Sequence, residues 1–274
     1  LATSSSQRAA VARSARWREL AWLLPVLLLA GYLRLDGIQQ TSVRYCDGSW
    51  YAADARVWHR CARVVLDPVT WGGLLNADKA LLRHQVAVHG LDFSERYYKP
   101  SQGYTFLVAA MMFLVGDTPA AAPTTNAWMS TLAVVVAYLL ARRFFDRGVA
   151  WTAALLLAIC PYDVVYARAD LADAAATFFL LAGTCAWVWQ LSAPAPSRLR
   201  LIFTGMLLGY ALTCHYRSLH LPLLLGALDI LRCLKHGESE TPRRLARLRA
   251  HARRWLWIGA GLLIPALCIE AVFQ

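Results

Sequence analysis

The sequence has none of the motifs that mark nucleotide-dependent enzymes or serine hydrolases. It contains no Walker phosphate-binding loop, no Rossmann glycine fingerprint and no G-x-S-x-G nucleophile elbow. ATP hydrolysis and serine hydrolase chemistry are therefore without support. The seven cysteines include no C-x-x-C pair, and their spacing to histidines is not that of zinc ligands, so we expect no structural zinc.

Acidic residues are scarce: 17 Asp and Glu stand against 28 Lys and Arg, which gives a net charge of +11. This excess could indicate nucleic-acid binding, but the basic residues cluster beside apolar segments, as the positive-inside rule predicts for cytoplasmic loops. The clusters are Arg8, Arg13, Arg16 and Arg18; Arg142, Arg143 and Arg147; Arg198 and Arg200; and the arginines of residues 232–254. We therefore expect contact with membrane lipids and no nucleic-acid partner.

Apolar residues are abundant, at 58% of the chain with a mean hydropathy of +0.41. They recur in runs along the whole length rather than in one core, which is typical of membrane proteins. The runs are residues 20–33, 104–115, 127–145, 149–166, 172–191, 201–213, 219–234 and 255–273. No small-residue cleavage site follows the first run, so we interpret it as a helix rather than a signal peptide. The sequence predicts an all-α polytopic membrane protein.

The basic clusters also predict which loops share a side of the membrane. If all eight runs crossed, the basic residues 142–147 and 235–254 would face outward. If residues 104–115 enter the membrane and return, every basic cluster faces inward. The outer face then carries loop 35–102 and the turns 161–173 and 214–220. The Ala-, Leu- and Arg-rich usage with few lysines hints at a GC-rich bacterium, so we expect an inner-membrane protein whose outer face meets the periplasm.

This topology divides the chain into four parts. We expect a cytoplasmic basic segment (1–19), a transmembrane module (20–234) that includes the extracytoplasmic loop 35–102, a basic cytoplasmic loop (235–254) and a final transmembrane helix (255–274). The basic loop has helical amphipathic spacing and suits a surface of anionic headgroups. The chain starts with Leu1 and stops soon after an apolar run, so we expect it to be the N-terminal module of a longer protein.

Acid and base groups gather on the predicted outer face. Asp47 is followed closely by Tyr51, Asp54 and Arg56, and Lys99 ends the same loop. A carboxylate at a membrane surface can take a proton from an acceptor hydroxyl or amine while that group attacks a sugar carbon. A lipid phosphate leaving that carbon needs fixed cations to stabilise its charge. The stretch therefore indicates chemistry on a lipid-linked substrate, although Asp54 and Arg56 could instead form a simple loop salt bridge.

Four more residues belong to the same predicted face. Arg217 and His215 could hold the phosphate together with Lys99, while Arg168 and Asp173 could shape the pocket. Ionisable groups at a membrane edge are costly and usually functional. Two plainer interpretations remain open: Arg168 and Asp173 could form a structural pair, and His215 could be an interfacial anchor.

Two cysteines of the same loop, Cys46 and Cys61, could form a disulfide around Asp47 in an oxidising compartment. The other cysteines lie in or beside apolar runs, where cysteine is usually a small packing residue.

Five short motifs occur in a fixed order along the chain. They are Asp47-Gly-Ser-Trp-Tyr51; Lys99-Pro-Ser101; Gly116 followed by Ala141-Arg-Arg-Phe-Phe145; Pro161 followed by Tyr166-Ala-Arg-Ala-Asp-Leu-Ala-Asp173; and Gly205 to Gly209 followed by His215-Tyr-Arg217. This order resembles the GT-C glycosyltransferases, in the branch of protein O-mannosyltransferases and lipid A aminoarabinose transferases. The resemblance covers roughly residues 20–235. The chain departs from the branch's Asp-Glu pair at Gly48 and from its Lys-Pro-Pro motif at Ser101.

The resemblance implies roles for individual residues. Asp47 would be the catalytic base, Lys99 a ligand of the donor phosphate and Asp173 the second acid of the active site. It further implies a polyprenyl-phosphate sugar donor and an extracytoplasmic acceptor, which could be a protein, a lipid or a glycan. A divalent metal at Asp47 and Asp173 is conceivable, but phosphate-binding Lys and Arg lessen the need for one, so we expect no cofactor.

The sequence therefore predicts an inverting membrane glycosyltransferase that uses a polyprenyl-phosphate sugar. One alternative is a non-catalytic GT-C-like scaffold in a membrane-protein complex, which the missing second acid favours. Another is a lipid-carrier transporter, for which Asp229 is the main acid placed within an apolar run.

Overall fold

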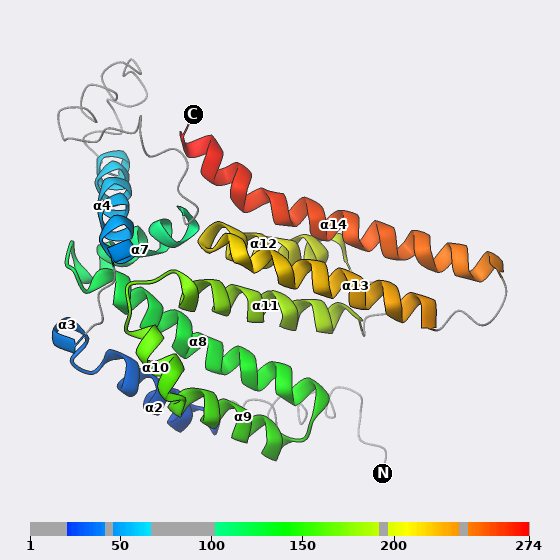
Figure 1. The fold of residues 1–274 in the computed structure, drawn as a ribbon, viewed down its shortest axis with the longest axis horizontal. Coiled ribbons are helices and arrows are strands. Elements are labelled where there is room, and N and C mark those ends of the chain that lie inside the picture. Colours follow the sequence, from blue (N-terminus) through cyan, green and yellow to red (C-terminus); the bar gives the residue numbers. More distant parts are fainter. Residues whose placement is uncertain (1–20, 42–45, 67–101, 192–196, 236–240, 274) are drawn as a thin grey trace, which may run out of the picture.

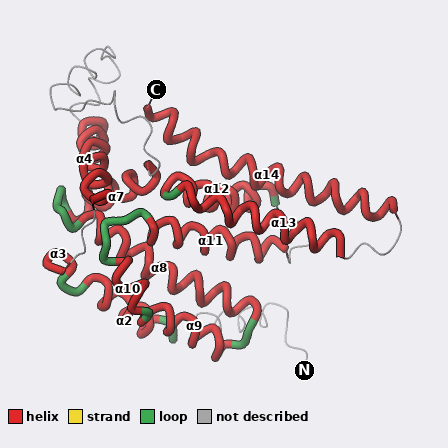
Figure 2. The backbone as a smooth tube through the Cα atoms, viewed as in Figure 1, coloured by secondary structure: helices red, strands yellow, loops and turns green. Residues whose placement is uncertain are grey.

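The computed structural model describes residues 21–41, 46–66, 102–191, 197–235 and 241–273 (Figure 1). These residues form helices and turns with no β-strand among them, which confirms the predicted all-α class (Figure 2). The helices are α2 (Leu24–Leu35), α3 (Ile38–Thr41), α4 (Cys46–Leu66), α7 (Gln102–Val115), α8 (Ala121–Phe144), α9 (Arg147–Ile159), α10 (Pro161–Ala167), α11 (Asp173–Leu191), α12 (Arg198–Cys214), the 3-10 turn η1 (Tyr216–Leu219), α13 (His220–Lys235) and α14 (Thr241–Phe273).

Most of the long helices run side by side, and α4 and α7 lie at one end of them (Figure 1). Helix α12 packs most extensively on α14 and α11, and α8 connects α11 to a group formed by α2, α9 and α10. The α8–α9 turn and the C-terminal end of α13 lie at the end opposite α4 (Figure 1). The basic clusters of these helices thus lie far from the turn between α10 and α11, as the topology argument predicted.

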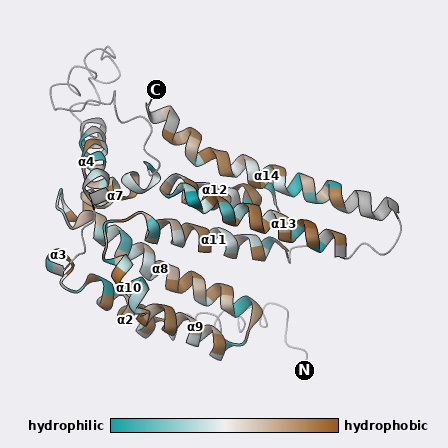
Figure 3. Ribbon diagram, viewed as in Figure 1, coloured by the Kyte–Doolittle hydropathy of each residue, from teal (hydrophilic) through white to brown (hydrophobic). Residues whose placement is uncertain are grey.

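Three of the described helices are long and apolar enough to cross a membrane: α8, α11 and the Leu248–Ile269 part of α14. The bent pair α9 and α10 would make a fourth. Helix α7 has 14 residues and is therefore about 21 Å long, too short for a hydrocarbon core of about 30 Å. Its length agrees with the prediction that this segment does not cross. Hydrophobic residues are concentrated along α2, α8 and α9 (Figure 3).

Glycines bring α12 and α14 into unusually close contact. A Cβ added at Gly205 or Gly209 would overlap the backbone carbonyl of Ile258 or Leu262, and one added at Gly261 would overlap the carbonyl of Ile202. Small residues spaced four apart allow helix backbones to approach in this way, and packing then replaces the missing hydrophobic drive within a bilayer. The Gly205-x-x-x-Gly209 spacing therefore fixes the position of α12 against α14.

The apolar run 149–166 is not one straight helix, because the helix breaks at Pro161, where the predicted turn 161–173 begins. Helices α9 and α10 meet there at 55°. Proline has no N–H and its ring clashes with the preceding turn, so a helix normally ends just before it. Cys160 accordingly has an extended ψ of 114°. The break removes the usual i+4 donors of the last α9 carbonyl groups, and Leu157 O accepts only a longer backbone bond, from Cys160 N at 3.4 Å.

Arg34 of α2 binds these freed carbonyl groups. Its Nη1 donates to Ala158 O at 2.8 Å, and its Nη2 donates to Leu157 O at 3.1 Å and to Asp163 Oδ2 at 2.5 Å. Its Nε donates to Ser130 Oγ at 2.7 Å. The Arg34 side chain is fully buried, and a buried charge is tolerated only when it is paired and hydrogen-bonded in this way.

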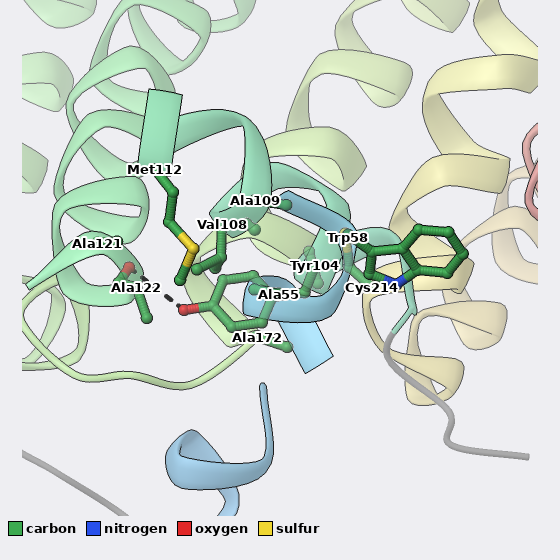
Figure 4. Packing of buried hydrophobic residues seen from close by; sticks show 12 residues of the cluster. Ala55, Trp58, Tyr104, Val108, Ala109, Met112, Ala121, Ala122, Ala172 and Cys214 are labelled. Carbon is green, nitrogen blue, oxygen red and sulfur yellow. Dashed lines mark hydrogen bonds between the residues drawn. The ribbon is translucent and has the colours of Figure 1, made fainter. Parts of the chain in front are cut away.

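Part of the region predicted as an extracytoplasmic loop is helical. Helix α4 packs on α7 through Trp58 against Phe106 and through His59 against Phe113, with ring centroids 4.4 and 4.6 Å apart. Ala55 and Trp58 join a buried cluster with Tyr104 of α7 (Figure 4). These α4 residues follow the three-to-four-residue spacing of an amphipathic helix, which was the signal for this helix in the sequence.

A predicted disulfide and a predicted segment boundary both fall within single continuous helices. Cys46 and Cys61 belong to the same helix α4, so their Cα atoms are about 22 Å apart, whereas a disulfide needs less than about 7 Å. The predicted pairing is therefore wrong. The proposed boundary at residue 254 does not interrupt α14, which runs without a break from Thr241 to Phe273.

Candidate functional site

The candidate site lies at the end of the helices where α4 begins and α10 turns into α11 (Figure 1). Three chain segments contribute to it: the first turn of α4, residues 168–173 after α10, and the η1 turn after α12. The second and third segments lie where one helix ends and the next begins, so their backbone groups and charged side chains are available outside regular helix.

Asp173 begins α11 and is exposed. A carboxylate in the first turn of a helix is stabilised by the positive end of the helix dipole. Asp173 interacts electrostatically with Arg217 of η1 and with Tyr166 of α10. Two residues that the sequence placed on one membrane face are thus close enough to influence each other.

The η1 turn positions Arg217. His215 precedes the turn, and its Nδ1 accepts a hydrogen bond from Arg217 N at 3.2 Å, which caps the turn. The His215 ring stacks on Tyr216 with centroids 5.4 Å apart, and the Arg217 guanidinium lies 5.9 Å from the centre of the Tyr216 ring. Tyr216 and then Asp173 raise the pKa of Arg217, so this exposed group is a permanent cation. A cation presented this way can bind a phosphate or another anion.

A buried polar residue, Asn126 of α8, binds the backbone of the turn between α10 and α11. Its Nδ2 lies within hydrogen-bonding distance of Ala169 O at 2.7 Å, Leu171 O at 2.5 Å and the Tyr104 hydroxyl at 3.0 Å. Tyr104 in turn donates to Ala122 O at 3.3 Å (Figure 4). Asn126 and Tyr104 are fully buried, so these bonds form away from water and fix the turn firmly.

Asp170 lies between the two carbonyls that Asn126 holds. It is largely buried, and its carboxyl group fills the space that a side chain at Gly48 of α4 would need. The first turn of α4 therefore contacts the α10–α11 turn directly at Gly48.

The described hydrogen bonds of Arg168 go to backbone carbonyl groups. Its Nη1 donates to Leu33 O at 3.0 Å and its Nη2 donates to Asp36 O at 2.7 Å, at the C-terminal end of α2. A guanidinium suits the end of a helix because the last carbonyls carry partial negative charge. This placement supports an organising role, since it ties the α10–α11 turn to α2.

Of the predicted site residues on α4, Tyr51 and Asp54 face the interior of the protein and Arg56 lies at its surface. Tyr51 meets the Tyr104 ring edge-on at 5.3 Å, and Asp54 is buried in the same helix. Arg56 Nε binds Asp117 Oδ1 at 2.7 Å, which links α4 to the turn after α7. The salt bridge of Arg56 is therefore made with Asp117, a partner that the sequence argument had not considered.

The structure does not describe the side chains of two further predicted site residues. Asp47 belongs to the first turn of α4, but its side chain lies outside the described residues. Lys99 lies outside them altogether. Among the described side chains, no three of His, Cys, Asp and Glu gather closely enough to hold a metal ion. The absence of a cofactor stays a prediction.

A comparison with protein families identifies the chain. Residues 100–236 match the profile of the dolichyl-phosphate-mannose-protein mannosyltransferases. The chain belongs to this family. No curated protein matches it closely enough to be named as a relative. The matched region includes α7 through α13, and with it Asp173, His215 and Arg217. Family membership makes the chain a membrane glycosyltransferase of the GT-C type.

Sequence reasoning missed Asn126, Asp170 and the Arg34–Asp163 pair. Each had a signal: a polar residue within or beside an apolar helix is expensive to bury and needs a partner. The partner could not be found from the sequence, because Arg34 and Asp163 are 129 positions apart.

Proposed function

We propose that the chain transfers a sugar from a polyprenyl-phosphate donor to an acceptor at the outer face of the membrane. The observation that carries the proposal is the family match, which spans the segments bearing Asp173 and Arg217. The electrostatic interaction between these two residues adds support, because a carboxylate and a fixed cation at the same end of the helices suit a site that handles a phosphate and a proton together. The acceptor is a protein, a lipid or a glycan.

The proposed reaction is a single displacement at the sugar. An oxygen or nitrogen of the acceptor attacks the anomeric carbon as the bond from this carbon to the phosphate oxygen breaks. Asp47 takes the proton that the acceptor loses, and the polyprenyl phosphate leaves with the electron pair of the broken bond. Attack opposite the leaving group inverts the anomeric configuration.

The remaining residues are assigned to charge and position. Lys99 and Arg217, with His215, hold the donor phosphate and stabilise the charge that it gains on leaving. Asp173 orients the acceptor and, together with Arg168, shapes the pocket. Tyr51, Asp54 and Arg56 keep α4 in place beside it. We assign the reaction to the periplasmic side of a bacterial inner membrane, because basic clusters are typical of the cytoplasmic side and lie at the opposite end of the helices.

The test is sugar transfer by the purified protein in liposomes with a panel of radiolabelled polyprenyl-phosphate sugars. We expect transfer by the unaltered chain, and a loss of about a hundredfold or more in Asp47→Asn and in Asp173→Asn. Arg217→Gln should mainly raise the KM for the donor. Asp146→Asn is a matched control, because Asp146 is an exposed carboxylate at the start of α9, at the opposite end of the helices.

Two outcomes would overturn the proposal. Full transfer by Asp47→Asn would remove this residue as the base. Absence of transfer by the unaltered, correctly folded protein with every donor would favour the scaffold interpretation, in which Asp47→Asn leaves assembly with partner proteins intact.

A further inference from the structure

The contact between Gly48 and Asp170 joins two segments far apart in the sequence. A Cβ built on Gly48 would fall inside the Asp170 carboxyl group, overlapping its carbon and both oxygens. Both residues are buried. The contact is possible only because residue 48 has no side chain, since any other residue would need the volume that the carboxyl group occupies.

The position of Asp170 is fixed from the other side as well. Asn126 Nδ2 lies 2.7 Å from Ala169 O and 2.5 Å from Leu171 O, the carbonyls of the two neighbours of Asp170. Tyr104 is also within electrostatic reach of the Asp170 carboxyl group. Asn126 therefore holds the backbone on both sides of Asp170, and the Asp170 carboxyl group lies against the first turn of α4 at Gly48.

Gly48 directly follows Asp47, the proposed catalytic base. It is also the position at which the chain departs from the Asp-Glu pair that its first motif resembles. A carboxylate is thus missing from position 48 of the sequence, while in the folded chain a carboxylate from position 170 fills the volume of the missing side chain.

We propose that Asp170 is a positioning residue that replaces an acid at position 48. Its carboxylate docks the first turn of α4 on the α10–α11 turn and supplies a negative charge at Gly48, the residue that follows Asp47 in the chain. Gly48 and Asp170 then form one functional unit, in which the glycine makes room and the aspartate supplies the charge. This inference rests on the proposed function for its catalytic part, while the docking of α4 is independent of it.

The geometry allows the carboxylate to be returned to position 48. The carboxyl carbon of Gly48→Asp would lie one bond, about 1.5 Å, beyond the Cβ that now overlaps Asp170. In an Asp170→Gly background that volume is empty, so the double variant Gly48→Asp/Asp170→Gly would restore a carboxylate at nearly the same place. Gly48→Asp alone would force two carboxyl groups into one volume and should fold poorly.

The experiment compares Asp170→Asn, Asp170→Gly and the double variant with the unaltered protein. The readouts are the kcat and KM of sugar transfer and the hydrogen-exchange protection of the α4 amides in lipid nanodiscs. We expect kcat to fall at least tenfold in both single variants, with little change in the donor KM. Exchange protection of the α4 amides that follow its first turn should fall in Asp170→Gly, because the first-turn amides themselves have no helical partners. The double variant should regain this protection and a kcat within about threefold of the unaltered protein.

Asp170→Asn separates charge from shape, because asparagine fills the same volume without the charge. Full activity in Asp170→Asn would overturn the catalytic part, and so would a folded double variant no more active than Asp170→Gly. If the unaltered protein transfers no sugar, the proposed function fails but the exchange data still decide the docking. Unchanged α4 protection in Asp170→Gly would overturn the docking.

Discussion

The Arg34 guanidinium binds the Asp163 carboxylate at the point where α9 breaks into α10, with Nη2 2.5 Å from Oδ2. Arg34 comes from α2 and is fully buried, while the side chain of Asp163 is 24% exposed. Ser130 of α8 donates to the same carboxylate oxygen at 2.5 Å. Three helices and a helix break therefore meet at one ion pair, which fixes the frame that carries the candidate site.

Removing one charge of this pair should be costly. Asp163→Asn leaves the Arg34 charge buried without its counterion, and breaking a buried pair typically costs about 3–5 kcal/mol. We expect a loss near 3 kcal/mol in the free energy of unfolding, because the carbonyls of Leu157 and Ala158 still accept from Arg34. Unfolding by denaturing detergent would measure it, with Asp146→Asn expected to change stability by less than about 0.5 kcal/mol. An equal loss of stability in both variants would show that the Arg34–Asp163 pair contributes no more than an exposed carboxylate does.

Arg168 should not be replaceable by lysine. Its two terminal nitrogens donate to the separate carbonyls of Leu33 and Asp36, and the point charge of a lysine cannot reproduce that fork. Arg168→Lys should lower the free energy of unfolding by about 1–3 kcal/mol. The exposed Arg147→Lys serves as the control. A large rise in the donor KM of Arg168→Lys with unchanged stability would instead indicate direct contact with the donor.

The α12–α14 contact should not tolerate a methyl group. In Gly209→Ala the new Cβ would overlap the Leu262 carbonyl, so the helices must separate, and overpacking of this kind costs about 1–3 kcal/mol. Gly259→Ala is a matched control on α14, because nothing lies within 4 Å of a Cβ there. That variant should be neutral or more stable by up to about 1 kcal/mol, since alanine favours helix. Thermal unfolding in detergent would compare them.

The docking of α4 should weaken in mild acid. Burial, and then the charge of Arg63, lowers the pKa of His59 below its usual 6.5, while Asp117 acts in the opposite direction. The unfolded or undocked chain therefore binds a proton more readily than the docked one. Stability should fall as the pH drops through about 6.5 and level off below the folded pKa.

His59→Phe should flatten this pH dependence, whereas the exposed His220→Gln should leave it unchanged. Hydrogen exchange of α4 between pH 7.5 and 5 is the measurement. A His59→Phe variant with the original slope would assign the effect to another group.

The sequence by itself determined the all-α class of the protein and the grouping of its basic residues at one end of the helices. Each predicted apolar run corresponds to one helix, except 149–166, which forms the broken pair α9 and α10. Apolar segments of this length must satisfy their own backbone hydrogen bonds in a bilayer, which favours helices. Basic residues mark the opposite end from the site, and Asp173 and Arg217 were expected on one face. Local composition and helix breaks encode these features, so they can be predicted from the sequence without knowing the tertiary structure.

Only the tertiary structure decided which groups meet. The sequence showed a missing acid at Gly48, but the carboxyl group of Asp170 fills that place only after α4 packs on the α10–α11 turn. Arg34 finds Asp163 only when α2, α8 and α9 come together. Such contacts depend on packing between segments more than a hundred residues apart, and the energy of a buried charge is set by the partners that the fold brings to it.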